Sequence, residues 1–186
     1  MYSWDINYLS IGITKHGQRV FFIPIPWVQT AHAYNMKVPD VFIAPEDLCD
    51  HELMEKIMSF HIVGCYVLTS LDDYSFLANL KEARDIFIAE AINLNNLSFL
   101  STLGEWKMLF IEGAHLKDLE PIYQSSEIER MWPAFCLCFA NCEVDDTSAL
   151  NKMSHISELI VMGVDDDDER AKWKDILART YRYYCL

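Results

Sequence analysis

Three clustered cysteines are the residues in this chain best suited to metal chemistry. Cys136, Cys138 and Cys142 lie close together in the sequence, and zinc accepts thiolate ligands readily. A structural zinc site also needs a fourth ligand at a recognised spacing, and the C-x-x-C knuckle is missing. We therefore expect structural cysteines and neither a metal nor a cofactor.

Carboxylates are concentrated in two places. The run Asp165–Glu169 has the charge of a calcium site but lacks the glycine and the alternating ligand spacing of a calcium-binding loop. Carboxylates are stabilised at the start of a helix by its macrodipole, so the run predicts a helix start that could also contact a basic partner. The second group, Asp47, Asp50, His51 and Glu52, falls within residues 46–60, which we interpret as a solvated helix face.

No motif of a known catalytic class is present. The histidines are scattered, and the chain contains no H-E-x-x-H, no G-x-G-x-x-G and no G-x-S-x-G. We therefore expect no enzymatic activity. One alternative is a hydrolase or transferase of unknown class, with a pocket around His32, Asp40 and Glu46.

Composition limits the class of protein and the class of partner. The 186 residues are 52% hydrophobic and carry a net charge of −13, which fits one globular domain with an acidic surface. Such a surface repels nucleic acids and anionic membranes and attracts basic proteins. Because we find neither a signal peptide nor an apolar stretch of membrane-spanning length, we expect a soluble, cytoplasmic protein with reduced cysteines.

The elements that position these residues follow an internal repeat. Residues 74–80 and 97–103 share a serine, a phenylalanine and two leucines at a spacing of 23. The pattern apolar-x-x-apolar-x-apolar recurs six times, at intervals of 24, 21, 23, 28 and 22 residues. Its second apolar positions are Val41, Cys65, Ile86, Leu109, Leu137 and Leu159. Regular recurrence of this kind predicts stacked units that share one core.

The repeat resembles that of leucine-rich-repeat proteins, L-x-x-L-x-L-x-x-N/C-x-L. Residues 106–116 and 134–144 match best, and the resemblance covers residues 38–164. It implies an α/β solenoid with parallel strands on one face and returning helices or turns on the other. The asparagine or cysteine position departs from the family, because only Cys142 conforms. The other units have Glu46, Ser70, Ala91, Ala114 and Val164 there. An ordinary α/β sandwich with similarly spaced strands is the alternative.

The ends of a solenoid need caps, and we expect one domain in three parts. Residues 1–37 would form an N-terminal β cap, residues 38–164 the repeats, and residues 165–186 a C-terminal capping helix. That helix would place Trp173, Ile176, Leu177 and Tyr181 on one face.

Between the two inward positions of each strand lies one residue that must point outward. These outward residues are Phe42, Tyr66, Phe87, Phe110, Cys138 and Ile160. Carboxylates two positions away would edge the row, namely Asp40, Asp85, Glu112 and Glu158. Exposed aromatic rings with a charged rim are typical of a protein-binding patch. The alternatives are that the N-terminal segment covers the rings, that two copies pair through them as a homodimer, or that they belong to a core.

Taken together, these features favour a protein-binding module. The most specific interpretation is an acidic inhibitor or immunity-type protein that neutralises a basic toxin or enzyme through the strand face. A generic adaptor or structural interaction protein is the alternative, and it predicts binding that is nearly insensitive to salt.

Overall fold

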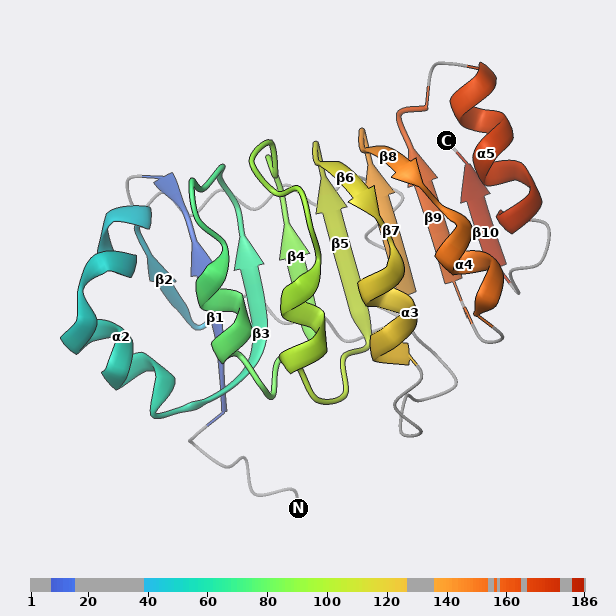
Figure 1. The fold of residues 1–186 in the computed structure, drawn as a ribbon. Helices are drawn as coiled ribbons and strands as arrows, with labels where there is room; N and C mark the ends of the chain where they lie inside the picture. The colour runs from blue at the N-terminus through green and yellow to red at the C-terminus, as the bar shows by residue number, and fades with distance from the viewer. Residues whose placement is uncertain are drawn as a thin grey trace.

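In the computed structural model, the described residues are 8–15, 39–126, 136–153, 156, 158–164, 167–177 and 182–185. The chain forms an α/β fold built on a large open parallel sheet (Figure 1). Within the described residues, no helix has the length and apolar character needed to cross a membrane.

Ten strands are described, eight of them in the main sheet. They are β1 (Tyr8–Ile13), β2 (Val41–Ile43), β3 (His61–Val67), β4 (Asp85–Ile88), β5 (Met108–Glu112), β6 (His115–Asp118), β7 (Cys136–Ala140), β8 (Glu143–Asp146), β9 (Glu158–Met162) and β10 (Arg182–Cys185). The main sheet has the order β10-β9-β7-β5-β4-β3-β1-β2, and a second parallel sheet pairs β6 with β8.

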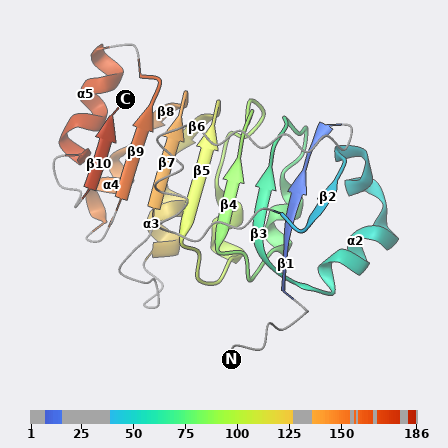
Figure 2. The same cartoon turned by 180° about the vertical axis from the view of Figure 1, so that it is seen from behind.

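Short helical segments return the chain from one strand to the next. They are the 3-10 helices η2 (Pro45–Cys49), η3 (Ser75–Asn79) and η4 (Ser98–Thr102), and the α-helices α2 (His51–Met58), α3 (Glu120–Ser126), α4 (Ser148–Lys152) and α5 (Asp167–Leu177). The returning segments between the strands lie on one face of the main sheet, and the view from behind shows the strands in front of them (Figure 2).

The core fills the space between the sheet and these segments. The predicted inward positions meet there in one register, because Cys65 pairs with Ile86, Ile86 with Leu109, Leu109 with Leu137 and Leu137 with Leu159. All five side chains are fully buried. The predicted spacing and strand neighbours are therefore confirmed from β3 to β9.

The two ends of the sheet differ from the prediction. Val41 of β2 pairs with Ile11 of β1, and β1 in turn pairs with β3. The first predicted unit is therefore not adjacent to the second, and part of the expected N-terminal cap is a strand inside the sheet. At the other end, α5 is followed by β10, which pairs with β9. The prediction of a capping helix over residues 165–186 was wrong in extent, because α5 ends at Leu177 and a strand follows, although Trp173 and Ile176 are buried as expected.

A left-handed backbone residue follows four of the strands at the same place in the unit. These residues are Glu90 (φ 51°), Gly113 (φ 76°), Asn141 (φ 50°) and Gly163 (φ 71°). Backbone hydrogen bonds link this turn to the next unit, as from Gly113 N–H to the carbonyl of Ala140 at 2.9 Å. Glycine adopts this conformation without strain and asparagine tolerates it, whereas a glutamate is strained there.

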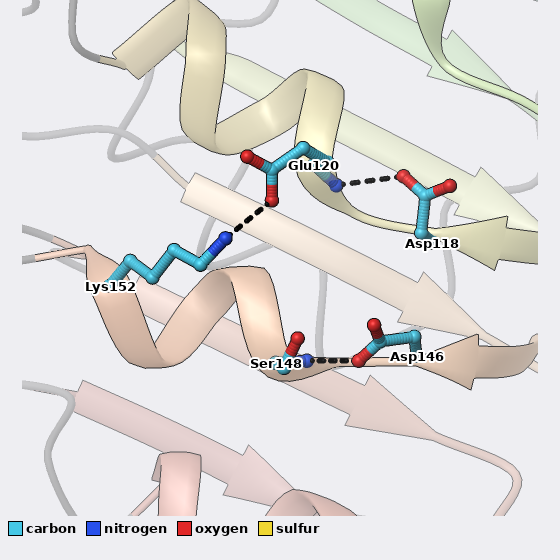
Figure 3. A network of polar contacts seen from close by, with 5 residues as sticks. All are labelled: Asp118, Glu120, Asp146, Ser148 and Lys152. Atoms are coloured by element: carbon cyan, nitrogen blue, oxygen red, sulfur yellow. Dashed lines mark hydrogen bonds and ion pairs between the residues drawn. The ribbon is translucent and has the colours of Figure 1, made fainter.

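A second recurring turn starts the helical segments. The side chain of an aspartate or asparagine accepts a hydrogen bond from the backbone N–H two residues later. The four pairs are Asp73 with Ser75 (2.8 Å), Asn96 with Ser98 (3.2 Å), Asp118 with Glu120 (3.0 Å) and Asp146 with Ser148 (2.8 Å). Figure 3 shows the last two, together with the ion pair that joins their helices, Lys152 to Glu120 at 2.9 Å. The interaction satisfies a backbone N–H that the start of a helix leaves unpaired.

Glycine at position 90 is expected to stabilise the protein. Glu90→Gly removes the left-handed strain and should raise the free energy of unfolding by about 1 kcal/mol. Glu90→Ala is the matched control, because it removes the same charge and keeps the strain. Urea unfolding of both variants checks the prediction. A glycine variant less stable than the alanine variant would contradict it, since alanine is the more stabilising residue wherever φ is negative.

Candidate protein-binding surface

The predicted row of rings exists on the face of the sheet opposite the helical segments. Tyr66 pairs with Phe87, and Phe87 with Phe110, on the adjacent parallel strands β3, β4 and β5. The rings of Phe87 and Phe110 stack with centroids 4.0 Å apart and an interplanar angle of 4°, and those of Tyr66 and Phe87 lie 6.4 Å apart. Their predicted alignment is confirmed.

Their predicted exposure is wrong. Tyr66 is 1% exposed, Phe87 5% and Phe110 1%, and Cys138 and Ile160 of the same row are also buried. Together with Met108, Cys136 and Ala140 they form a second hydrophobic cluster. Parallel sheets are usually apolar and buried on both faces. The row is therefore core, and these rings present no surface on which a partner could dock.

Phe42 and Asp40 do not join the row. Gly12 of β1 lies between Phe42 and Tyr66 in the register, and the Phe42 ring occupies the space that a side chain at Gly12 would need, 2.9 Å from its Cβ position. Asp40 is exposed, and it accepts a 3.3 Å hydrogen bond from the backbone N–H of Ser10. Insertion of β1 separates both residues from the other predicted partner-binding positions.

The other three carboxylates predicted to edge the row of rings do not form a solvated rim. Glu158 is 6% exposed, and Asp85 and Glu112 are half-buried. Burial, with the charge of Glu90 as a smaller cause, raises the pKa of Glu112, while a hydrogen bond from Asn141 opposes the shift. These side chains lie at the margin of a buried cluster, where burial disfavours the charged form.

The clustered cysteines do not converge on a ligand site. Cys136 and Cys138 belong to the ring face, whereas Cys142 packs in the main core and directs its thiol to the carbonyls of Ile111 and Ala140 at 3.4 and 3.3 Å. Burial raises the pKa of Cys142 to about 11 and that of Cys65 to about 12. In the described part of the chain no group of three His, Cys, Asp or Glu side chains could hold a metal ion.

Two other candidate sites lie partly outside the described residues. The first is the alternative catalytic pocket. Its His32 lies outside them, while Asp40 and Glu46 are described and exposed. Of the acidic run, residues 165 and 166 fall outside, and α5 begins at Asp167.

The described residues form an open groove on the helical face of the sheet. It has a volume of about 870 Å³ and lies between η2 and α2 on one side and η3 with its preceding turn on the other. We call it the acidic groove. Its lining residues are Pro45, Glu46, Leu48, Cys49, His51, Met54, Glu55, Met58, Ser70, Leu71, Asp72, Asp73, Ser75, Phe76 and Asn79. In Figure 1, α2 lies at the β2 end of the sheet.

Local hydrogen bonds fix the walls of the acidic groove. Asp50 caps α2 by accepting from the N–H of Leu53 at 3.0 Å, in agreement with the favoured residue type at that position. On the opposite wall, Asp73 accepts from the backbone N–H and the hydroxyl of Ser75, both at 2.8 Å. These bonds lower the pKa of Asp73. The carboxylate is therefore charged at neutral pH and held toward the turn.

Apolar side chains line the groove between its carboxylates. Leu48, Met54, Met58 and Phe76 are half-buried and pack with their inner parts on the main core. A second hollow of about 510 Å³ between η3 and η4 adjoins the acidic groove and shares Asp72, Asp73 and Ser75 with it. The hollow therefore continues along the helical face, although the shared Asp72 and Asp73 are its only carboxylates within the described residues.

The sequence did not single out this groove. Residues 46–60 were interpreted as a solvated face, yet Met54 and Met58 lie four residues apart on α2, a spacing that places both on one side of the helix. That pair was an available signal. The opposite wall comes from the turn before η3, and only the fold brings the two together.

Comparison with known proteins gives no relative: no family model, no curated protein and no solved structure matches this chain.

Proposed function

We propose that this chain is a short leucine-rich-repeat-like solenoid that binds a basic protein. Successive units from β3 to β9 pair in parallel with their neighbours in the sequence, apart from the small β6 and β8, which pair with each other. The left-handed turn and the aspartate or asparagine turn recur at corresponding places. This repetition supports a stack of similar units, each sharing its core with the next.

The acidic groove is the observation on which the choice of partner rests. Residues 44–79 contain seven carboxylates and one lysine. Four of those carboxylates, from Glu46, Glu55, Asp72 and Asp73, line the groove, and no lysine or arginine does. Within the described residues, none of the four forms an ion pair with a lysine or arginine. A basic partner would neutralise a surface that the described part of the chain leaves charged.

The specific form of the proposal is an inhibitor or immunity-type protein for a basic toxin or enzyme. A net charge of −13 would accelerate encounter with such a partner, and apolar contacts in the groove would lengthen the lifetime of the complex. We also propose a cytoplasmic location, because the cysteines whose side chains the structure describes, Cys49, Cys65, Cys136, Cys138 and Cys142, are free thiols.

Capture from the source lysate, followed by measurements on the purified captured protein, tests the proposal. The captured protein should be basic, and its dissociation constant should rise at least tenfold between about 50 and 300 mM salt, because charged contacts are screened. If that protein is a toxin or an enzyme, an equimolar amount of this chain should suppress its activity. Isothermal titration calorimetry at two salt concentrations and an activity assay provide the measurements.

Two pairs of substitutions localise the binding. Glu46→Gln with Asp72→Asn removes two charges from the acidic groove and should weaken binding at least tenfold. Glu143→Gln with Asp145→Asn removes two exposed charges of β8 and should change binding less than twofold. A partner that is not basic, or an affinity that does not depend on salt, would argue for a generic adaptor instead.

A further inference from the structure

Beyond the binding of a basic protein, we propose that the acidic groove receives one face of a basic amphipathic α-helix of the partner. The inference rests on the proposed function and adds the shape and the chemical pattern of the segment that binds.

The groove offers an apolar strip as well as charge. Met54 and Met58 come from α2, Leu48 from η2 and Phe76 from η3, and each leaves part of its side chain accessible. Unbranched methionine side chains adapt their shape to an incoming apolar group. A purely cationic segment would leave this strip uncovered, so the segment that fits carries apolar side chains too.

Both walls of the groove contribute carboxylates as well as apolar side chains. Glu46 and Glu55 lie on the η2 and α2 wall, and Asp72 and Asp73 lie on the η3 wall. Lysines or arginines on both sides of an apolar stripe would meet them. A basic amphipathic helix has this arrangement, since residues three and four apart form its apolar stripe and the remaining positions carry charge.

The surroundings favour a helix over an extended segment. The walls are helical segments and turns, and no strand lines the groove. An added strand would therefore find no sheet edge there for backbone pairing, whereas a helix satisfies its own backbone hydrogen bonds. A second copy of this chain fits poorly, because its net charge is also −13.

Synthetic peptides test the inference on the full-length protein. The probe is an 18-residue peptide of leucine and lysine with leucines spaced three and four apart, labelled for fluorescence anisotropy. One control has the same composition with leucines placed around the helix, and a second has glutamate in place of lysine. The patterned peptide should bind at least tenfold more tightly than the scrambled one, and the glutamate peptide should not bind.

Substitutions in the groove identify the site. Met54→Ser with Met58→Ser should weaken binding of the patterned peptide at least tenfold, whereas Met153→Ser, a half-buried methionine at the end of α4, should leave it unchanged. If the double variant does not fold, chemical labelling of the exposed Cys49 thiol tests the site instead. In a Cys185→Ser background, a maleimide adduct at Cys49 should block the peptide, and bound peptide should slow the labelling.

The outcomes separate this inference from the proposed function. Equal binding of the patterned and scrambled peptides, or binding unaffected by the groove variants, overturns the inference, while salt-dependent binding of a basic protein would still stand. Absence of any basic partner overturns both. A dimer in sedimentation that dissociates on Met54→Ser with Met58→Ser assigns the groove to a second copy and also overturns the inference.

Discussion

Replacing Phe87 and Phe110 together by serine is expected to unfold the protein. Both rings are almost fully buried, and they stack at 4.0 Å on neighbouring strands. Loss of a buried phenylalanine side chain typically costs about 3–5 kcal/mol, and each serine adds a hydroxyl that must find a hydrogen-bond partner. Two such losses approach or exceed the whole stability of an ordinary domain, about 5–15 kcal/mol.

Circular dichroism and urea unfolding measure the effect. Phe42→Ser is the matched control, because Phe42 is half-buried and lies outside the stacked row, and it should cost clearly less. Phe87→Leu should keep the fold with a loss of about 1–2 kcal/mol, since much of the apolar volume remains. A double serine variant that keeps its secondary structure and its unfolding midpoint would mean that the rings are not core.

The second large effect is expected at the C-terminal end. Trp173 of α5 is 0% exposed, and its ring lies 5.5 Å from that of Phe139 on β7. Trp173→Ala should cost about 3–5 kcal/mol. In a stack of units that contact only their neighbours, the loss should concentrate at that end. We expect α5, β10 and the outer side of β9 to open while β3 to β5 stay protected.

Hydrogen exchange with mass spectrometry distinguishes local opening from global unfolding. Faster exchange confined to residues 158–185 would support a solenoid, whereas a uniform increase across the sheet would indicate one cooperative unit and weaken that proposal. Trp106→Ala is the comparison, because Trp106 is 2% exposed in the middle of the stack and its loss should affect units on both sides. Trp173→Phe should retain most of the protection.

The acidic groove could be predicted only in part. α2 carries its own signals, including the capping Asp50 and the pair Met54 and Met58. The facing wall at Asp72 and Asp73 comes from the turn after the next strand. The distance between two turns depends on how the units stack, and no local sequence pattern predicts that distance.

The repeating unit and its register could be predicted from the amino-acid pattern. Cys65, Ile86, Leu109, Leu137 and Leu159 pair as their spacing predicts, because each unit must turn its apolar positions toward a core that it shares with its neighbours.

The strands at the two ends of the sheet, and the burial of its second face, could not be predicted from that pattern. β1 is inserted between β2 and β3, where Gly12 makes room for the ring of Phe42. Such pairing joins segments far apart in the chain, so no periodicity encodes it. Alternation along a strand likewise places Tyr66, Phe87 and Phe110 on one face, but it does not say whether that face meets water or protein. In the folded chain the three rings are buried.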